Sequence, residues 1–103
     1  MTRTELIELL LTNLNINMPK AKSEVQHKIY DNLAYLSDVS VERIRQLGIK
    51  FVDESNFTVD EANLIIMYAS WLYTKRQNGE GMPRMLKYAL NNKLLSQKAA
   101  ENA

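Results

Sequence analysis

The chain has 103 residues, of which 46% are hydrophobic and 24% charged, and its 13 basic and 12 acidic side chains nearly cancel. This composition is typical of one folded domain with a single core, and it argues against a disordered chain or a strongly basic nucleic-acid binder. The chain contains no cysteine, which excludes disulfides, zinc–thiolate sites and cysteine nucleophiles within it.

The first predicted helix covers residues 4–13. Its apolar residues recur at helical spacing and are Leu6, Ile7, Leu10, Leu11 and Leu14. Either Thr2 or Thr4 is a suitable N-cap. Residues 15–20 are predicted to be a connector, because Pro19 disfavours helix there.

Two more helices are predicted before residue 49. Ser23 is a suitable N-cap for the second helix, and Ser37-Asp38 are expected to end it. Its apolar face comprises Val25, Ile29, Leu33 and Leu36. Ser40 is a suitable N-cap for a short third helix over residues 41–47, and Gly48 follows where a left-handed residue often ends a helix.

The central helix has the clearest start signal. An ordered loop is expected over residues 49–57, and Thr58 with Glu61 then matches the capping-box pattern. The helix is predicted to run to about Gln77 and is apolar nearly all round. Such a helix is the buried centre of its domain or is shared with a neighbouring subunit.

The last helix follows a turn at Asn78-Gly79 and is predicted to begin with Pro83 at its first position. Its inward-facing residues are expected to be Met85, Leu86, Ala89, Leu90 and Leu94. Residues 96–103 have nothing large and apolar to bury, so we predict a flexible tail. The prediction is an all-α bundle of four to five helices, forming a single domain over residues 1–95, with an ordered loop before the central helix.

Residues for catalysis or metal binding are sparse. His27 is the only histidine, and the acidic residues lack the spacing of a calcium loop. We therefore predict no metal, no cofactor and no enzymatic activity. The most apolar window, residues 64–73, is about half of the ~20 residues that a membrane helix needs, so no membrane partner is expected.

The charges are unevenly distributed along the chain. Residues 51–74 contain four acidic and no basic residues, whereas from residue 75 onward six basic residues outnumber two acidic ones. Two explanations fit this charge pattern. The charged residues can simply form solvent-exposed faces, or they can form complementary acidic and basic surfaces that associate head to tail. A helix-turn-helix unit over residues 40–48, with Arg43 and Arg45 near phosphates, is a further alternative and indicates nucleic-acid binding.

Two segments carry a family resemblance. "VDEANLIIMYASWLYTKRQNGEGMPRMLKYALNN" (59–92) resembles the second half of head–tail connector (adaptor) proteins of tailed bacteriophages, in which a hydrophobic helix ends in an apolar-aromatic-basic run. A short glycine-containing turn, Met82-Pro83 and another helix follow here, as in that family. "SEVQHKIYDNLAYLSDVS" (23–40) is similar to the helix preceding these elements, and the resemblance covers residues 23–95.

The resemblance implies a virion structural protein at the head–tail interface, present in the host cytoplasm during assembly. Such a protein forms a ring beneath the portal, extends the DNA channel and docks the next connector, stopper or tail protein. Its expected partners are the portal protein, copies of itself, that downstream protein and, non-specifically, DNA in the channel. The alternative function is a small helical nucleic-acid-binding protein in regulation or packaging.

The resemblance and the charge pattern together select candidate contact residues. Candidate contacts to a neighbouring subunit or the portal are Trp71, Tyr73, Lys75, Arg76, Met82, Arg84, Lys87 and Lys98. Asp53 and Glu54 form the candidate complementary acidic surface. The family also suggests that residues 96–103 are an arm that becomes ordered on the portal.

Overall fold

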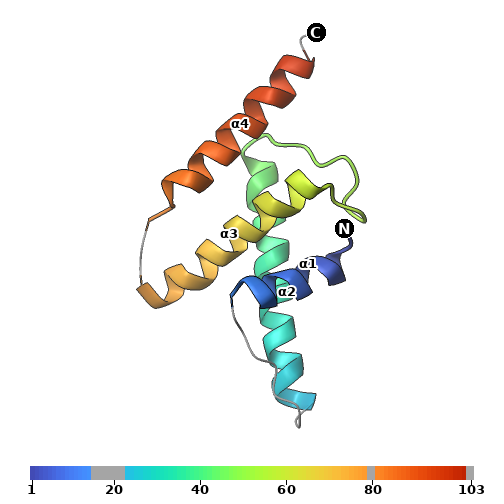
Figure 1. The fold of residues 1–103 in the computed structure, drawn as a ribbon, viewed down its shortest axis with the longest axis vertical. Coiled ribbons are helices and arrows are strands. Elements are labelled where there is room, and N and C mark those ends of the chain that lie inside the picture. The colour runs from blue at the N-terminus through green and yellow to red at the C-terminus, as the bar shows by residue number, and fades with distance from the viewer. Residues whose placement is uncertain (15–22, 79–80, 102–103) are drawn as a thin grey trace.

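The computed structural model describes residues 1–14, 23–78 and 81–101, without the side chains of residues 23–25 and 76–78. Within these ranges the chain forms four helices and no strand (Figure 1). They are α1 (Arg3–Asn13), α2 (Ser23–Gln46), α3 (Val59–Asn78) and α4 (Arg84–Glu101). The predicted small all-α bundle is thus confirmed. The predicted connector at 15–20 and Gly79 of the predicted turn lie outside the described residues.

Helix α1 begins at Arg3, one residue before the predicted start, and Thr2 is its cap of the two predicted candidates. The Thr2 hydroxyl accepts a hydrogen bond from the backbone N–H of Glu5, whose carboxylate accepts one from the N–H of Thr2, so Thr2 is the N-cap. The Arg3 guanidinium donates to both carboxylate oxygens of Asp38 on α2, at 3.0 and 2.9 Å. The inward face of α1 is completely buried and consists of Leu6, Ile7 and Leu10.

The predicted second and third helices are one continuous helix, α2, so the expected break at Ser37-Asp38 is wrong. Ser40 is fully buried, and its hydroxyl donates to the carbonyl of Leu36 at 2.6 Å instead of capping a new helix. A serine satisfied by the carbonyl four residues earlier is compatible with an uninterrupted helix. Because no turn separates two helices here, the helix-turn-helix interpretation of residues 40–48 is also wrong.

The end of α2 follows the prediction. Gly48 has a φ of +101°, a conformation that glycine adopts without the steric penalty of a Cβ atom. Its N–H donates to the carbonyl of Arg45 at 2.9 Å, which closes the helix and turns the chain into the loop.

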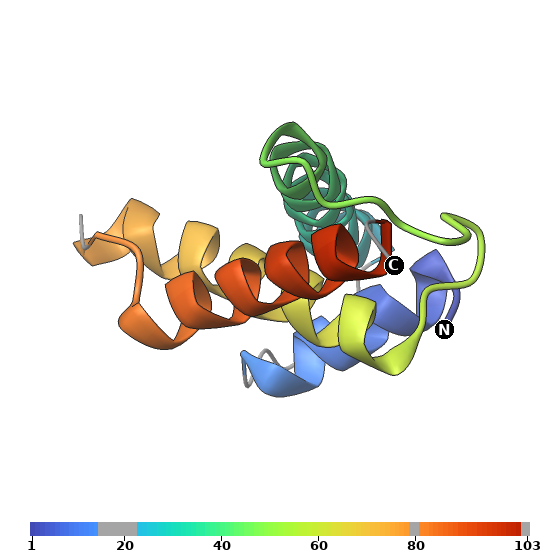
Figure 2. The same cartoon turned by 90° about the horizontal axis from the view of Figure 1, so that it is seen from above.

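Helix α3 lies at the centre of the bundle. It packs mainly on α2 and also contacts α1 and α4 (Figure 1). Seen from above, α4 lies along α3 on the outside of the bundle (Figure 2). The largest fully buried apolar side chains come from all four helices and the loop, and are Leu6, Ile7, Leu10, Leu33, Leu36, Ile44, Ile49, Ile65 and Leu86.

The loop between α2 and α3 is irregular, as predicted, and is tied to α3 by Glu61. The Glu61 side chain is fully buried, with one carboxylate oxygen accepting from the N–H of Thr58 at 2.9 Å. The other accepts from the N–H of Val52 at 3.0 Å. The capping box is therefore confirmed, and the same carboxylate also holds the loop.

Aromatic packing and a contact to the start of the chain complete the loop. Phe51 and Phe57 pack edge to face with their ring centroids 5.4 Å apart. The N–H of Phe57 donates to the carbonyl of Met1 at 2.7 Å, next to the cap of α1. The loop therefore connects the first turns of α1 and α3.

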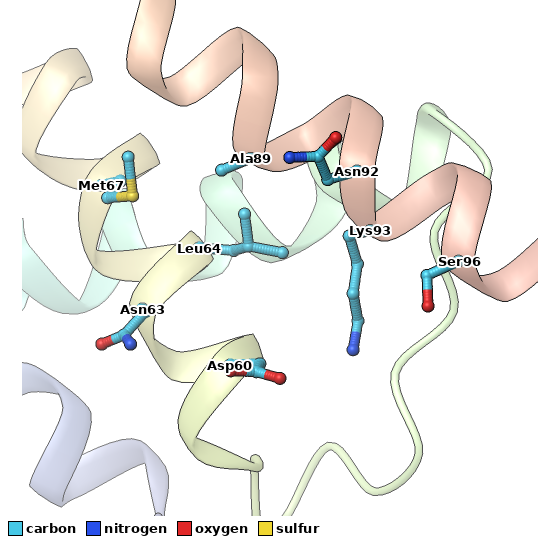
Figure 3. Close-up of a pocket in the computed structure, with 8 residues that line it drawn as sticks. All are labelled: Asp60, Asn63, Leu64, Met67, Ala89, Asn92, Lys93 and Ser96. Atoms are coloured by element: carbon cyan, nitrogen blue, oxygen red, sulfur yellow. The ribbon is translucent and has the colours of Figure 1, made fainter.

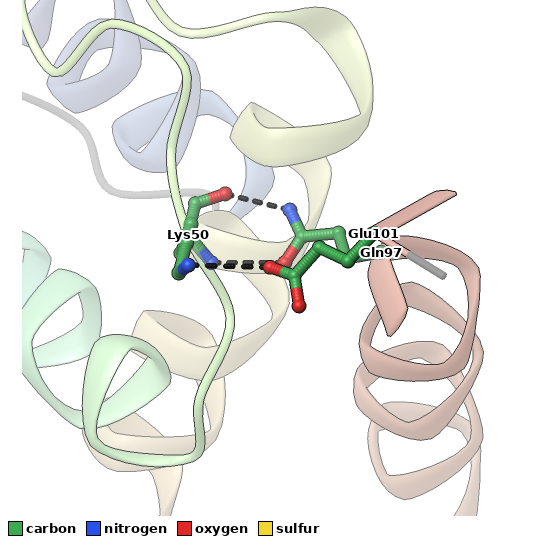
Figure 4. A network of polar contacts seen from close by, with 3 residues as sticks. All are labelled: Lys50, Gln97 and Glu101. Atoms are coloured by element: carbon green, nitrogen blue, oxygen red, sulfur yellow. Dashed lines mark hydrogen bonds and ion pairs between the residues drawn. The ribbon is translucent and has the colours of Figure 1, made fainter. Parts of the chain in front are cut away.

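Helix α4 extends further than expected. It begins at Arg84, one residue after Pro83, and continues to Glu101, so residues 96–101 are helical where a flexible tail was predicted. Gln97 explains the extension: its side-chain amide accepts from the N–H of Lys50 at 2.9 Å and donates to the Lys50 carbonyl at 2.6 Å (Figure 4). The Lys50 ammonium also pairs with Glu101 at 3.2 Å.

We expect Ile65→Ala to lower the free energy of unfolding by about 2–5 kcal/mol, because Ile65 is fully buried and the substitution leaves a cavity. Urea denaturation measures this loss. Val59→Ala is the control on the same helix, since Val59 is 73% exposed, and should change stability by less than about 0.5 kcal/mol. Equal effects of the two substitutions would show that α3 is rotated from the arrangement described.

We also expect Glu61→Gln to cost about 1–3 kcal/mol, because an amide offers only one acceptor oxygen where the carboxylate serves two backbone N–H groups. Asp60→Asn is the matched control, since Asp60 is exposed and contributes mainly through the helix dipole, worth less than about 1 kcal/mol. Chemical denaturation of both variants tests the difference. A Glu61→Gln protein as stable as the wild type would contradict the bridging role.

Candidate functional site

Apart from Lys98, the candidate contact residues lie in two groups near the two ends of α3. Lys98 lies near the end of α4, next to Gln97, which bonds Lys50 of the loop. Asp53 and Glu54 belong to the loop before α3, whereas Trp71, Tyr73 and Lys75 lie in its last turns (Figure 1). A helix of 20 residues spans roughly 30 Å. The structure therefore places these acidic and basic groups toward opposite ends of α3.

The aromatic residues at the end of α3 contribute mainly to packing within the chain. Trp71 and Tyr73 are half-buried against the core, and Tyr68 packs edge to face on Trp71 with centroids 5.5 Å apart. The Lys75 ammonium lies 5.0 Å from the centroid of the Trp71 ring, in a cation–π contact. Lys75 itself is exposed, so its charge remains accessible to a partner. Arg76 lies among the residues whose side chains are not described.

The candidates from α4 differ in their surroundings. Met82 is half-buried and packs on the core, so it stabilises the corner between α3 and α4. Arg84, Lys87 and Lys98 are exposed, and none of them forms an ion pair with a described residue. Met85, predicted to face inward, is 73% exposed because Leu86 and Leu90 direct the opposite side of α4 to the core.

The acidic candidates are partly engaged within the chain. Asp53 accepts hydrogen bonds from the hydroxyl and the N–H of Ser55, at 2.6 and 2.9 Å. These bonds, the side-chain one first, lower the pKa of Asp53 below its ordinary value. Glu54 pairs with Arg45 at 3.2 Å, and Arg45 also pairs with Glu42 at 2.9 Å. Asp53 is therefore an exposed, ionised carboxylate at neutral pH, whereas Glu54 belongs to a surface ion-pair network.

A groove of about 340 Å³ between α3 and α4 was not predicted from the sequence (Figure 3). Apolar residues from both helices line it, namely Leu64, Met67 and Ala89. Its polar lining residues are Asp60, Asn63, Asn92, Lys93 and Ser96. No sequence signal marks this groove, because its two walls come from helices that meet only through tertiary packing.

The described residues contain no group of three or more His, Cys, Asp or Glu side chains arranged to hold a metal ion. His27 is exposed on α2. None of the four helices, over the part of the chain that is described, is long and apolar enough to cross a membrane.

No model of a known protein family matches this chain, and neither a curated protein nor a solved structure matches it. The connector resemblance therefore rests on the sequence pattern over residues 23–95, and the function is argued below from that pattern together with the surfaces described above.

We expect Ser55→Ala to raise the pKa of Asp53 toward its ordinary value of 3.8, because the substitution removes the largest of the hydrogen-bond contributions that favour the carboxylate. A lowered pKa means that the folded loop favours ionised Asp53. This contribution to stability is present above the unfolded pKa and is lost as the pH falls through the folded pKa.

A pH titration of the Asp53 side-chain carboxyl by carbon NMR measures the shift. Ser96→Ala, on the outer part of α4, is the control and should leave the Asp53 titration unchanged. An identical Asp53 pKa in the Ser55→Ala and wild-type proteins would contradict the assigned cause.

Proposed function

We propose that this protein is a head–tail connector subunit of a tailed bacteriophage, an adaptor that forms a ring beneath the portal. The ring extends the DNA channel and docks the next connector or tail-completion protein. The role is structural and involves no catalysis or cofactor. It is exercised in the virion, after assembly in the host cytoplasm. The sequence resemblance over residues 23–95 and the small all-helical fold support this proposal.

The observation that carries the proposal is the separation of opposite charges along α3. A ring requires each subunit to present two different surfaces that fit each other, because its contacts are heterologous. Exposed Lys75, Arg84 and Lys87, which we name the basic corner, come from the end of α3 and the start of α4. Exposed Asp53 belongs to the loop that precedes α3, at the other end of that helix. The basic corner of one subunit and Asp53 of the next form a complementary pair.

Exposed basic residues also suit contact with the portal protein and with DNA in the channel. Lys98 is exposed in the last turn of α4, without an ion pair to a described residue, and is available to an acidic portal surface. The same exposed cations suit non-specific contact with phosphates of channel DNA. Because α4 remains helical to Glu101, we propose a preformed helical arm over residues 96–101 for portal contact.

We expect the double variant Lys75→Glu, Lys87→Glu to lose most ring formation or attachment to portal-containing heads, because like charges then face each other across the subunit contact. Electron microscopy of the protein alone and after mixing with the heads measures assembly. Adding Asp53→Lys should restore part of the loss by exchanging the charges of the pair. Lys28→Glu on the exposed side of α2 is the matched control and should assemble normally.

Two results would contradict the proposal. Wild-type protein that forms no ring and does not attach to portal-containing heads would refute the adaptor role. Binding of the monomer to one duplex DNA sequence in preference to others, without attachment to those heads, would favour the nucleic-acid-binding alternative, because the adaptor makes only non-specific phosphate contacts. Circular dichroism of each variant establishes that helicity is retained.

A further inference from the structure

Helix α4 has a second apolar face that nothing in the described chain covers. Met85, Tyr88 and Leu95 are 73%, 58% and 63% exposed, on the side of the helix opposite buried Leu86 and Leu90. Three large apolar side chains on one helix face exceed the scattered exposure that is normal for a folded protein surface. We name Met85, Tyr88, Asn92 and Leu95 the outer stripe.

The spacing of the outer stripe indicates a helix as its partner. The four residues follow one another at intervals of three, four and three, the a and d positions of a heptad. Asn92 occupies an a position, where a polar side chain selects a register at some cost in stability. An a/d stripe is the surface on which a second helix packs its own a and d residues.

The charges beside the outer stripe indicate the sign of the partner. Residues 84–100 include four basic side chains and no acidic one. Arg84 and Lys98 take g positions directly beside the outer stripe, whereas Lys87 takes a c position farther from it. All three are exposed, and none forms an ion pair with a described residue. A partner helix with acidic residues flanking its apolar positions complements them.

Other occupants fit the outer stripe less well. Two copies of α4 side by side would bring their basic residues together without an intervening carboxylate from residues 84–100. Duplex DNA offers phosphates to the basic residues but no surface that rewards burial of Tyr88 and Leu95. In a membrane surface, Asn92 would place a polar amide in the middle of the apolar face.

We propose that the outer stripe of α4 binds an acidic amphipathic helix of a partner protein. The apolar residues of that helix pack on Met85, Tyr88 and Leu95, and its carboxylates pair with the flanking basic residues. Asn92 also lines the groove between α3 and α4, so the bound helix lies along one edge of that groove (Figure 3). The proposal rests on α4 itself and holds whether or not the protein is a phage connector.

The probe is a fluorescein-labelled synthetic peptide of about three heptads, with leucine at a and d and glutamate at e and g. Added to the full chain, it should bind saturably in fluorescence anisotropy. The double variant Tyr88→Glu, Leu95→Glu should weaken binding at least about tenfold, since both hot-spot side chains are lost and like charges introduced. Val52→Glu, Val59→Glu is the matched control, because both valines are highly exposed but lie outside α4, and it should bind as the wild type does.

A peptide with lysine in place of glutamate, otherwise identical, separates charge recognition from simple apolar adhesion and should not bind. Absence of binding by the glutamate peptide, or equal binding by the stripe variant, overturns the proposal. So does a wild-type dimer in sedimentation equilibrium that Leu95→Glu dissociates, since the occupant is then a second copy. Stripe-dependent binding to phosphatidylserine vesicles or duplex DNA, without binding of the glutamate peptide, likewise overturns it. Peptide binding by a protein that forms no ring refutes only the connector role.

Discussion

The buried carboxylate of Glu61 is the contact on which the arrangement of the other elements depends. It accepts hydrogen bonds from the N–H groups of Thr58 and Val52, and thereby joins the cap of α3 to the preceding loop. A fully buried carboxylate is costly unless its oxygens are satisfied, and here each oxygen has a backbone donor. These two bonds tie the loop to the first turn of the central helix.

The loop also contacts the two outer helices, α1 and α4. Through Phe57 it contacts the carbonyl of Met1 and so lies against the start of α1. Through Lys50 it holds Gln97 and Glu101 near the end of α4. Helix α4 is thus anchored on α3 along one side and on the loop near its end, which leaves its opposite face open.

The functional proposals follow from this division of α4 into a packed and an open face. The bundle completes its core with Leu86 and Leu90, so Met85, Tyr88 and Leu95 are not needed for internal packing. Basic side chains flank the open face, and the loop at the other end of α3 carries the exposed carboxylate of Asp53. We propose that these two separated surfaces make repeated contacts with other chains.

The corner between α3 and α4 shows how folding selects among candidate contact residues. Trp71 and Met82, both candidates from the sequence, are half-buried against the core, whereas Lys75 extends over the Trp71 ring with its charge exposed. The aromatic residue therefore serves the fold and supports the position of the cation. Apolar character alone did not distinguish these two roles, because core and interface residues share it.

The sequence by itself determined the features that depend on neighbours within one helical turn. The all-helical class, the Thr58 cap and the positive φ of Gly48 all arise from side chains and backbone groups three or four residues apart, whereas the choice of Thr2 over Thr4 as the first cap came from the structure. The candidate acidic and basic residues could likewise be identified from the sequence, because the charge of a side chain is a property of its residue type.

Only the tertiary structure decided the features whose partners are distant in the chain. Helix α2 continues through Ser37 and Ser40 because both are buried in the core, where the Ser40 hydroxyl bonds within the helix instead of starting another. Residues 96–101 are helical because Gln97 meets Lys50, 47 positions away. The rotation of α4, which turns Met85 outward, and the groove beside it arise where α4 packs on α3. Periodicity defines an apolar face, but the neighbour that covers it is specified only by packing in three dimensions.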